Sequence, residues 1–291
     1  MSLTYEDNGT PPIAQIFSPG DDRFVYIDEE PPCAPTQSTQ ENIMDKVWDI
    51  DTINSIADAL NSGMTFNGII ELFSPPVEEE ECGMDEIDLD SDESIEVIPA
   101  PQNERLIIGG PAGSGKSTFA ADYARLWKKL FPNGLIHLFA RQSDDPAFED
   151  IELEEIVVDQ SIIGEDLGIH DFKDTLVIFD DMDNLQDKDV INYIHKLLND
   201  LMACGRKQNI YVMYITHIFR NRQKTQVALN EANKIVFFNG MGDRQNVGVL
   251  KEYAQMNKDE IERLTTLPSR WCCLERKRPR YVVHEKGIFL L

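Results

Sequence analysis

From residue 103 to the end of the chain, short apolar runs alternate with segments in which apolar residues recur every three or four positions. Continuous apolar runs are typical of strands buried on both faces, and the longer spacing is typical of amphipathic helices. Their alternation predicts an α/β fold with a mostly parallel central sheet of five core strands and crossover helices. We expect strands at 105–109, 134–140, 175–180, 209–216 and 234–238, and helices at 116–130, 187–203, 225–232 and 258–266.

The chain after the last of these helices changes pattern. Two short apolar runs, Trp271–Leu274 and Tyr281–His284, flank the basic segment Arg276–Arg280. Two strands around a short polar turn predict a β-hairpin. Residues 101–291 are therefore expected to form one domain that ends in a β-hairpin.

The first 100 residues show no such alternation. Residues 1–76 contain one β-like run, Arg23–Ile27, and a helix start signal made by Ser38 and Glu41. Residues 77–100 are dominated by carboxylates. We expect an acidic N-terminal appendage, partly ordered over 1–76, and a disordered acidic linker over 77–100.

Charge divides the chain at the same place. The net charge is −25, and residues 1–100 carry −22 of it because they hold 24 acidic residues against Arg23 and Lys46. The remaining domain is close to neutral, which neither requires nor excludes binding to nucleic acid.

Cysteine spacing and apolar content indicate the compartment. The five cysteines form no CxxC pair and no ligand cluster with the five histidines, so we expect free thiols in a reducing compartment. No apolar stretch is long enough to cross a bilayer, and the acidic N-terminus lacks a signal-peptide core. These features predict a soluble, intracellular protein without a membrane span.

A glycine-rich loop with the pattern GxxxxGK[ST] lies between the first predicted strand and the first predicted helix. Glycines let backbone N–H groups point inward and the helix N-terminus adds partial positive charge, so the loop suits a nucleoside triphosphate. Lys116 would reach the β- and γ-phosphates, and the Ser117 hydroxyl would bind Mg²⁺. The predicted phosphate-binding residues are Gly110, Pro111, Ala112, Gly113, Ser114, Gly115, Lys116, Ser117 and Thr118.

Two aspartates end the strand predicted at 175–180. A carboxylate at the carboxyl end of a parallel strand beside the phosphate loop is placed to hold Mg²⁺, and we assign that role to Asp180. Asp181 would act as general base toward the attacking water, with Asp183 and Asp187 as competing candidates. Its side chain is one methylene shorter than glutamate, so the water must lie closer or a second residue must help. We expect the loop and the aspartates on adjacent, parallel strands.

Two basic residues complete the candidate site. His217 ends the strand predicted at 209–216, where it would donate to the γ-phosphate or to the attacking water, or else be an exposed strand-end histidine. Arg206 would act as an arginine finger on a neighbouring subunit's nucleotide, or else complement a helix dipole. Arg220 and Arg222 are rival candidates for the finger.

Taken together, these motifs resemble the FtsK–HerA superfamily of motor ATPases, and the downstream ones look like the DNA-packaging ATPases of large DNA viruses, the poxvirus-type branch. The resemblance covers roughly residues 104–291. The segments that carry it are Gly110–Thr118, Phe179–Leu185, Ala203–Arg206, Tyr214–His217, Leu229–Ile235 and Ser269–Trp271.

The resemblance implies a P-loop NTPase fold of the additional-strand type, which hydrolyses ATP with Mg²⁺ and assembles as a homo-oligomeric ring. It implies translocation of double-stranded DNA into a viral capsid, with capsid or portal-like vertex proteins as partners, at the virus assembly site of the host cell and in the virion. Lys116 and Ser117 match the phosphate and metal positions, Asp180 the metal position, Asp181 the water position and Arg206 the finger. The superfamily usually has Glu in place of Asp181 and Gln in place of His217, which concerns activation of the water rather than nucleotide binding.

Contact with DNA is less well defined by the sequence. A ring motor grips the phosphate backbone with Lys, Arg and backbone amides, without reading bases. The dense basic patches are Arg276–Arg280 and Arg220–Lys224, and each is either such a grip or a solvated loop. The acidic residues 1–100 would be an inert tail, a dock for a basic partner, or a DNA mimic in the channel.

Two other functions share the phosphate loop. A small-molecule or nucleoside kinase would need a lid and an acceptor pocket, and the sequence has no arginine-rich segment typical of such a lid. A nucleotide-gated scaffold would bind ATP and barely hydrolyse it.

Overall fold

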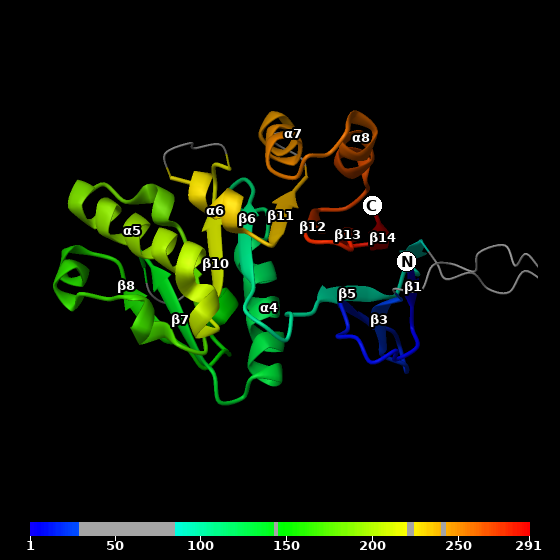
Figure 1. The fold of residues 1–291 in the computed structure, drawn as a ribbon, viewed down its shortest axis with the longest axis horizontal. Coiled ribbons are helices and arrows are strands. Elements are labelled where there is room, and N and C mark those ends of the chain that lie inside the picture. The colour runs from blue at the N-terminus through cyan, green and yellow to red at the C-terminus, as the bar shows by residue number, and fades with distance from the viewer. Residues whose placement is uncertain (29–84, 143–144, 220–223, 240–242) are drawn as a thin grey trace, which may run out of the picture.

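A large sheet forms the centre of the protein (Figure 1). The computed structural model describes residues 1–28, 85–142, 145–219, 224–239 and 243–291. Ten strands pair in the order β4-β14-β13-β12-β11-β6-β10-β9-β7-β8. Six of them are mutually parallel: β6 Arg105–Gly109, β7 Leu135–Ala140, β8 Glu154–Val157, β9 Thr175–Phe179, β10 Tyr211–Thr216 and β11 Lys234–Phe238. The mostly parallel α/β fold of a P-loop NTPase is thereby confirmed.

Helices cover both faces of this sheet (Figure 1). Alternate strand residues divide between two cores: Ile107, Val177 and Val212 pack on the side of α5 and α8, whereas Leu106, Ile178 and Met213 pack on the side of α4. The helices are α4 Lys116–Leu130, α5 Lys188–Cys204, α6 Gln226–Glu231, α7 Asp243–Glu252 and α8 Lys258–Thr266, with short 3₁₀ turns η1 Pro146–Phe148, η2 Gln160–Glu165, η3 Ile169–Phe172, η4 Met182–Asn184 and η5 Gly205–Gln208.

Strand order corrects one expectation. The phosphate-loop strand β6 and the aspartate strand β9 are parallel but not adjacent, because β10 pairs with both of them. This inserted strand is the additional strand that the fold assignment implied. The expectation of adjacency was therefore wrong, and its consequence is that the tip of β10 lies between the loop and the aspartates.

The C-terminal region is larger than the predicted hairpin. Strands β12 Trp271–Glu275 and β13 Tyr281–His284 do form an antiparallel pair, but β14 Gly287–Leu290 and β4 Glu86–Asp88 extend it to the edge of the sheet. Adding these strands buries Ile87, Ile288 and Phe289.

The N-terminal appendage is a small antiparallel sheet in the order β1-β3-β2-β5, formed by β1 Ser2–Thr4, β2 Ala14–Phe17, β3 Arg23–Asp28 and β5 Ser94–Val97. It packs on the α4 side of the large sheet, and Leu3, Ile16 and Val25 join that core. The prediction of a disordered linker over 77–100 is wrong for residues 85–100, since β4 and β5 each pair with a sheet there. Residues 77–84 and the helix predicted after Ser38 lie outside the described residues.

Besides β4 and β14, strand β8 and helix α7 of the large domain were not predicted from the sequence pattern. Strand β8 is an exposed edge strand that begins with two glutamates, so it lacks a continuous apolar run. Helix α7 carries few apolar residues and an internal glycine. None of the helices in the described ranges has the length and apolar content that crossing a bilayer would require.

Candidate nucleotide-binding site

The phosphate loop connects β6 to α4 through backbone conformations that favour glycine. Gly113 and Gly115 have φ of 73° and 103°, in the left-handed region, and Gly115 is the N-cap of α4. A Cβ added to Gly110 would lie 2.8 Å from the Cβ of Phe238, so that position has no room for a side chain. The loop is thus shaped for a close approach of backbone N–H groups to an anion.

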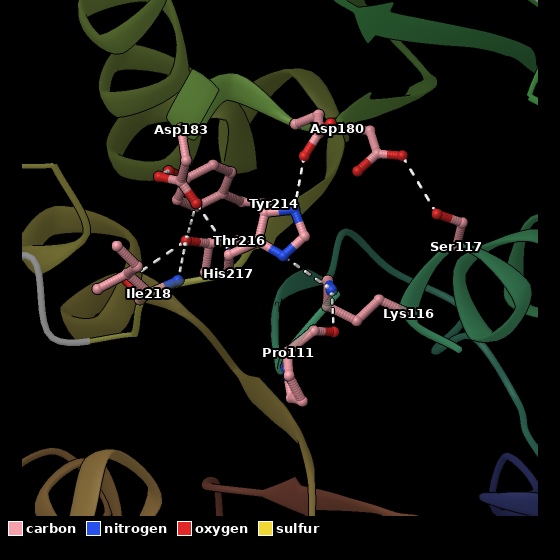
Figure 2. A network of polar contacts seen from close by, with 10 residues as sticks. Pro111, Lys116, Ser117, Asp180, Asp183, Tyr214, Thr216, His217 and Ile218 are labelled. Carbon is pink, nitrogen blue, oxygen red and sulfur yellow. Dashed lines mark hydrogen bonds and ion pairs between the residues drawn. The ribbon is translucent and has the colours of Figure 1, made fainter. Parts of the chain in front are cut away.

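Lys116, the first residue of α4, is held against its own loop. Its Nζ donates to the Pro111 carbonyl oxygen at 2.8 Å and lies 3.2 Å from Nδ1 of His217 (Figure 2). The side chain is buried, and this burial lowers the pKa of Lys116, while the carboxylates of Asp180, Asp181 and Asp183 act in the opposite direction. An ammonium in this position can transfer its hydrogen bonds to a phosphate oxygen.

Asp180 follows β9 directly and faces the first turn of α4. The Ser117 hydroxyl donates to Oδ2 of Asp180 at 3.4 Å (Figure 2). Burial, and then the neighbouring Asp181, raise the pKa of Asp180 to about 6. A hydroxyl and a carboxylate at this separation fit Mg²⁺, which takes oxygen ligands and is commonly held by one or two protein groups together with substrate phosphates. Within the described ranges no group of three or more His, Cys, Asp or Glu residues could hold a metal by itself.

Asp181 is directed toward the tip of β10. Its backbone is left-handed, with φ of 59°, and its Oδ1 lies 2.7 Å from Nε2 of His217. The two side chains are 47% and 29% exposed, so water can reach both. The predicted convergence of Lys116, Ser117, Asp180, Asp181 and His217 at the carboxyl end of the sheet is present in the structure.

Asp183, which the sequence offered as an alternative general base, binds the end of β10. Its carboxylate accepts from the Thr216 hydroxyl at 2.7 Å and from the His217 backbone N–H at 2.8 Å (Figure 2). Tyr214 OH approaches it at 3.5 Å. These bonds fix the end of β10, so Asp183 positions His217, a role that no local sequence signal identified.

The other competing carboxylate is outside the site. Asp187 caps α5 by accepting from the backbone N–H groups of Asp189 and Val190, and it also accepts from Gln160. Its oxygens are therefore committed to starting that helix.

Arg206 does not lie near the phosphate loop. It belongs to η5, just before β10 begins, and its carbonyl oxygen accepts from the Asn103 side chain beside the start of β6. It is thus at the amino ends of the strands, whereas the loop is at their carboxyl ends. Arg206 cannot serve its own subunit's nucleotide. Arg220 and Arg222 lie outside the described residues.

The basic segment Arg276–Arg280 is partly committed to the fold. The Arg276 guanidinium donates to the carbonyl oxygens of Leu229, Ala232 and Tyr253 at 2.6 to 2.8 Å. Arg280 donates to the Ala254 carbonyl oxygen at 3.0 Å. Arg276 and Arg280 therefore bind the C-terminal ends of α6 and α7 rather than project as free cations. Lys277 and Arg278 are the exposed basic residues of this segment.

A sequence relative of the chain is found in a virophage. No protein-family model matches the chain. The protein V3 of Sputnik virophage, described as uncharacterized, is 33% identical over 195 residues, which are 65% of this chain and 79% of V3.

Solved structures with similarity to the chain are more distant. The genome-packaging NTPase B204 of Sulfolobus turreted icosahedral virus 2, in complex with AMPPCP, has a TM-score of 0.45 and 13% identity, over 63% of this chain and 97% of B204. The pCW3 conjugation coupling protein TcpA, with ATPγS, has a TM-score of 0.43 and 11% identity, over 64% and 61% of the two chains. The fold assignment rests on the strand order and loop geometry of this chain itself.

Proposed function

Since the chain belongs to the same protein family as V3 of Sputnik virophage, whose role is uncharacterized, we propose a function from the geometry of its own site. The protein is an ATPase that drives double-stranded DNA into a viral capsid. The observation that carries the ATPase assignment is the meeting of Lys116, Ser117 and Asp180 with the His217–Asp181 pair at one end of the sheet. The viral source of V3 supports the viral setting.

Nucleotide binding begins with an exchange of partners at Lys116. The ammonium would leave the Pro111 carbonyl and His217 for the β- and γ-phosphate oxygens, while the N–H groups of the loop surround the phosphates. Ser117 and Asp180 would hold Mg²⁺, which when bound neutralises charge on the β- and γ-phosphates.

His217 is set by its two neighbours in one neutral tautomer. Lys116 can only donate, so Nδ1 must accept, and ionised Asp181 can only accept, so Nε2 must carry the proton. Departure of Lys116 toward the phosphates frees Nδ1 beside the site of the attacking water. His217 would thereby link the binding of the γ-phosphate by Lys116 to activation of the attacking water.

The His217–Asp181 pair accounts for both departures from the superfamily pattern. An aspartate reaches less far than a glutamate, and the imidazole at 2.7 Å supplies the second group that the shorter side chain requires. Asp181 orients His217 and takes part in removing the proton of the water, as general base directly or through the ring.

The motor proposal adds an oligomeric ring, in which Arg206 completes a neighbour's site. Its place at the amino ends of the strands, far from its own loop, means that a finger role would have to act in trans. The basic residues of the 220–224 segment, together with Lys277 and Arg278, would contact the DNA backbone. Arg276 and Arg280 on either side of that pair are already bonded to backbone carbonyls. Capsid or portal-like vertex proteins would dock the ring at the assembly site and in the virion.

ATPase measurements with and without double-stranded DNA test this function. The expected result is Mg²⁺-dependent hydrolysis that DNA stimulates and that Lys116→Ala abolishes, while Lys258→Ala, at the start of the remote helix α8, leaves it unchanged. Phosphate transfer to a small acceptor without any DNA effect would show a kinase. Tight ATP binding with negligible turnover in the presence of DNA would show a scaffold.

A further inference from the structure

A pocket of about 340 Å³ opens directly beside the phosphate loop. Ser114, Gly115 and Thr118 line it on one side, so it is continuous with the place where the phosphates would bind. Its volume is within the range of pockets that hold small organic ligands. The pocket thus extends the phosphate site in the direction of the first turns of α4.

The pocket combines aromatic surface with a few polar groups, as nucleoside sites do. Trp271 and Phe119 meet edge to face with ring centroids 5.0 Å apart, and both line the pocket. The hydroxyl of Ser114 is buried and has no hydrogen-bond partner among the described residues. Arg270 and Glu285 form an ion pair at the exposed rim.

The wall opposite the phosphate loop comes from the N-terminal appendage. Strand β5 contributes Ser94 to Val97, with Ile95 and Val97 buried in the core that the appendage shares with α4 and Ser94 and Glu96 on the other face. The Glu96 side chain has no hydrogen bond or ion pair within the described ranges, although it is half-buried. Burial raises the pKa of Glu96, and Asp122 across the pocket raises it further.

We propose that this pocket binds the nucleoside part of the triphosphate, with Trp271 as the stacking surface and β5 as the closing wall. The N-terminal sheet is then a component of the nucleotide site rather than an inert tail. Glu96 supplies an acceptor for the hydroxyl or amino donors of the nucleoside. This inference rests on the proposed function only in requiring that the loop bind a triphosphate.

Comparison of two ligands on the full chain separates this inference from the proposed function. Calorimetric titrations would use Mg²⁺–ATP and Mg²⁺–tripolyphosphate, which shares the phosphates but has no nucleoside. Trp271→Ala removes the stacking surface, and Ser94→Phe fills the pocket from the β5 side without touching buried residues. Ser91→Phe, in the turn before β5 and outside the pocket, is the matched control.

Both pocket variants are expected to bind ATP about tenfold more weakly than the wild type and tripolyphosphate equally well, and Ser91→Phe is expected to change neither affinity. Thermal unfolding of each variant checks that it folds, and Ser94→Phe covers the case in which Trp271→Ala does not. Unchanged ATP affinity, or equal weakening of both ligands, would overturn the inference. Wild-type protein that binds neither ligand would instead show that the proposed triphosphate site itself is wrong.

Discussion

The Nε2 atom of His217 lies 2.7 Å from Oδ1 of Asp181, and its Nδ1 lies 3.2 Å from the ammonium of Lys116. One imidazole therefore joins the residue proposed to bind the γ-phosphate to the residue proposed to activate water. The geometry requires a group that accepts on one side and donates on the other. A glutamine amide has the same two capacities.

The effect of replacing His217 should depend on whether the new side chain can accept on one side and donate on the other. His217→Gln is expected to keep turnover within about tenfold of the wild type, whereas His217→Ala is expected to lower kcat about 10²-fold, because only the amide can accept from Lys116 and donate to Asp181. Steady-state ATPase rates at saturating nucleotide make the comparison. Equal activity of the two variants would show that the bridge has no catalytic role.

Asp181→Asn separates catalysis from binding. The amide keeps the size of the side chain but cannot take a proton, so kcat is expected to fall about 10²- to 10⁴-fold while ATP affinity changes little. Calorimetric ATP titration beside the rate measurement tests both halves. A large loss of affinity with a normal kcat would place Asp181 in nucleotide binding instead.

Asp183→Asn should disturb His217 without touching nucleotide. Oδ2 accepts from both the Thr216 hydroxyl and the His217 N–H, and the amide oxygen of Asn can replace it only as a neutral and weaker acceptor, so the tip of β10 should be held less firmly. We expect kcat to fall about tenfold with KM nearly unchanged.

The chain offers a chemically matched control for this change. Asp187→Asn lies at the N-cap of α5, away from the site, where Asn caps about as well as Asp. Its turnover should equal that of the wild type. Similar losses in both variants would mean that Asp183 has only a general structural effect.

Local motifs could be interpreted from sequence because the physics that shapes them is local. The loop over 110–118 lies where its spacing predicted it, and the helix expected at 258–266 is present and begins with a capping box formed by Asn257 and Glu260. The buried strands were equally recognisable, since β9 is apolar throughout.

Long-range order was not accessible in the same way. The insertion of β10 between β6 and β9 depends on pairing between distant segments, and adjacency was predicted wrongly for that reason. Strands β4 and β5 lie in a carboxylate-rich stretch whose composition hides them, and each pairs with a strand far along the chain. The same holds for Asp183, whose role comes from facing β10.

Asp180 should make the nucleotide-free protein more stable at lower pH. Its pKa is about 6 in the folded chain, against an ordinary value of 3.8, so between these values the folded state binds more protons than the unfolded state. The free energy of unfolding therefore falls as pH rises through this window, and above about pH 6 the ionised carboxylate costs up to about 3 kcal/mol.

Asp180→Asn removes that cost and should raise the free energy of unfolding by up to about 3 kcal/mol at pH 8, with the gain vanishing near pH 4. Urea unfolding at both pH values, without nucleotide or divalent cation, measures the difference. A gain that is the same at pH 4 and pH 8 would contradict the assignment, since only a titrating carboxyl predicts the change.

Mixed assemblies test whether Arg206 acts on a neighbouring subunit. Arg206→Ala and Asp181→Asn subunits should each be about 10³-fold less active alone, because an arginine finger contributes about 10³- to 10⁵-fold to turnover. When they are mixed, some sites receive an intact Arg206 from one subunit and an intact Asp181 from the other, so activity should partly return and should rise with protein concentration. Wild-type turnover per subunit should show the same concentration dependence. Arg206→Ala that remains fully active, or a mixture no more active than its parts, would remove Arg206 from the mechanism and leave the segment after His217 as the source of the finger.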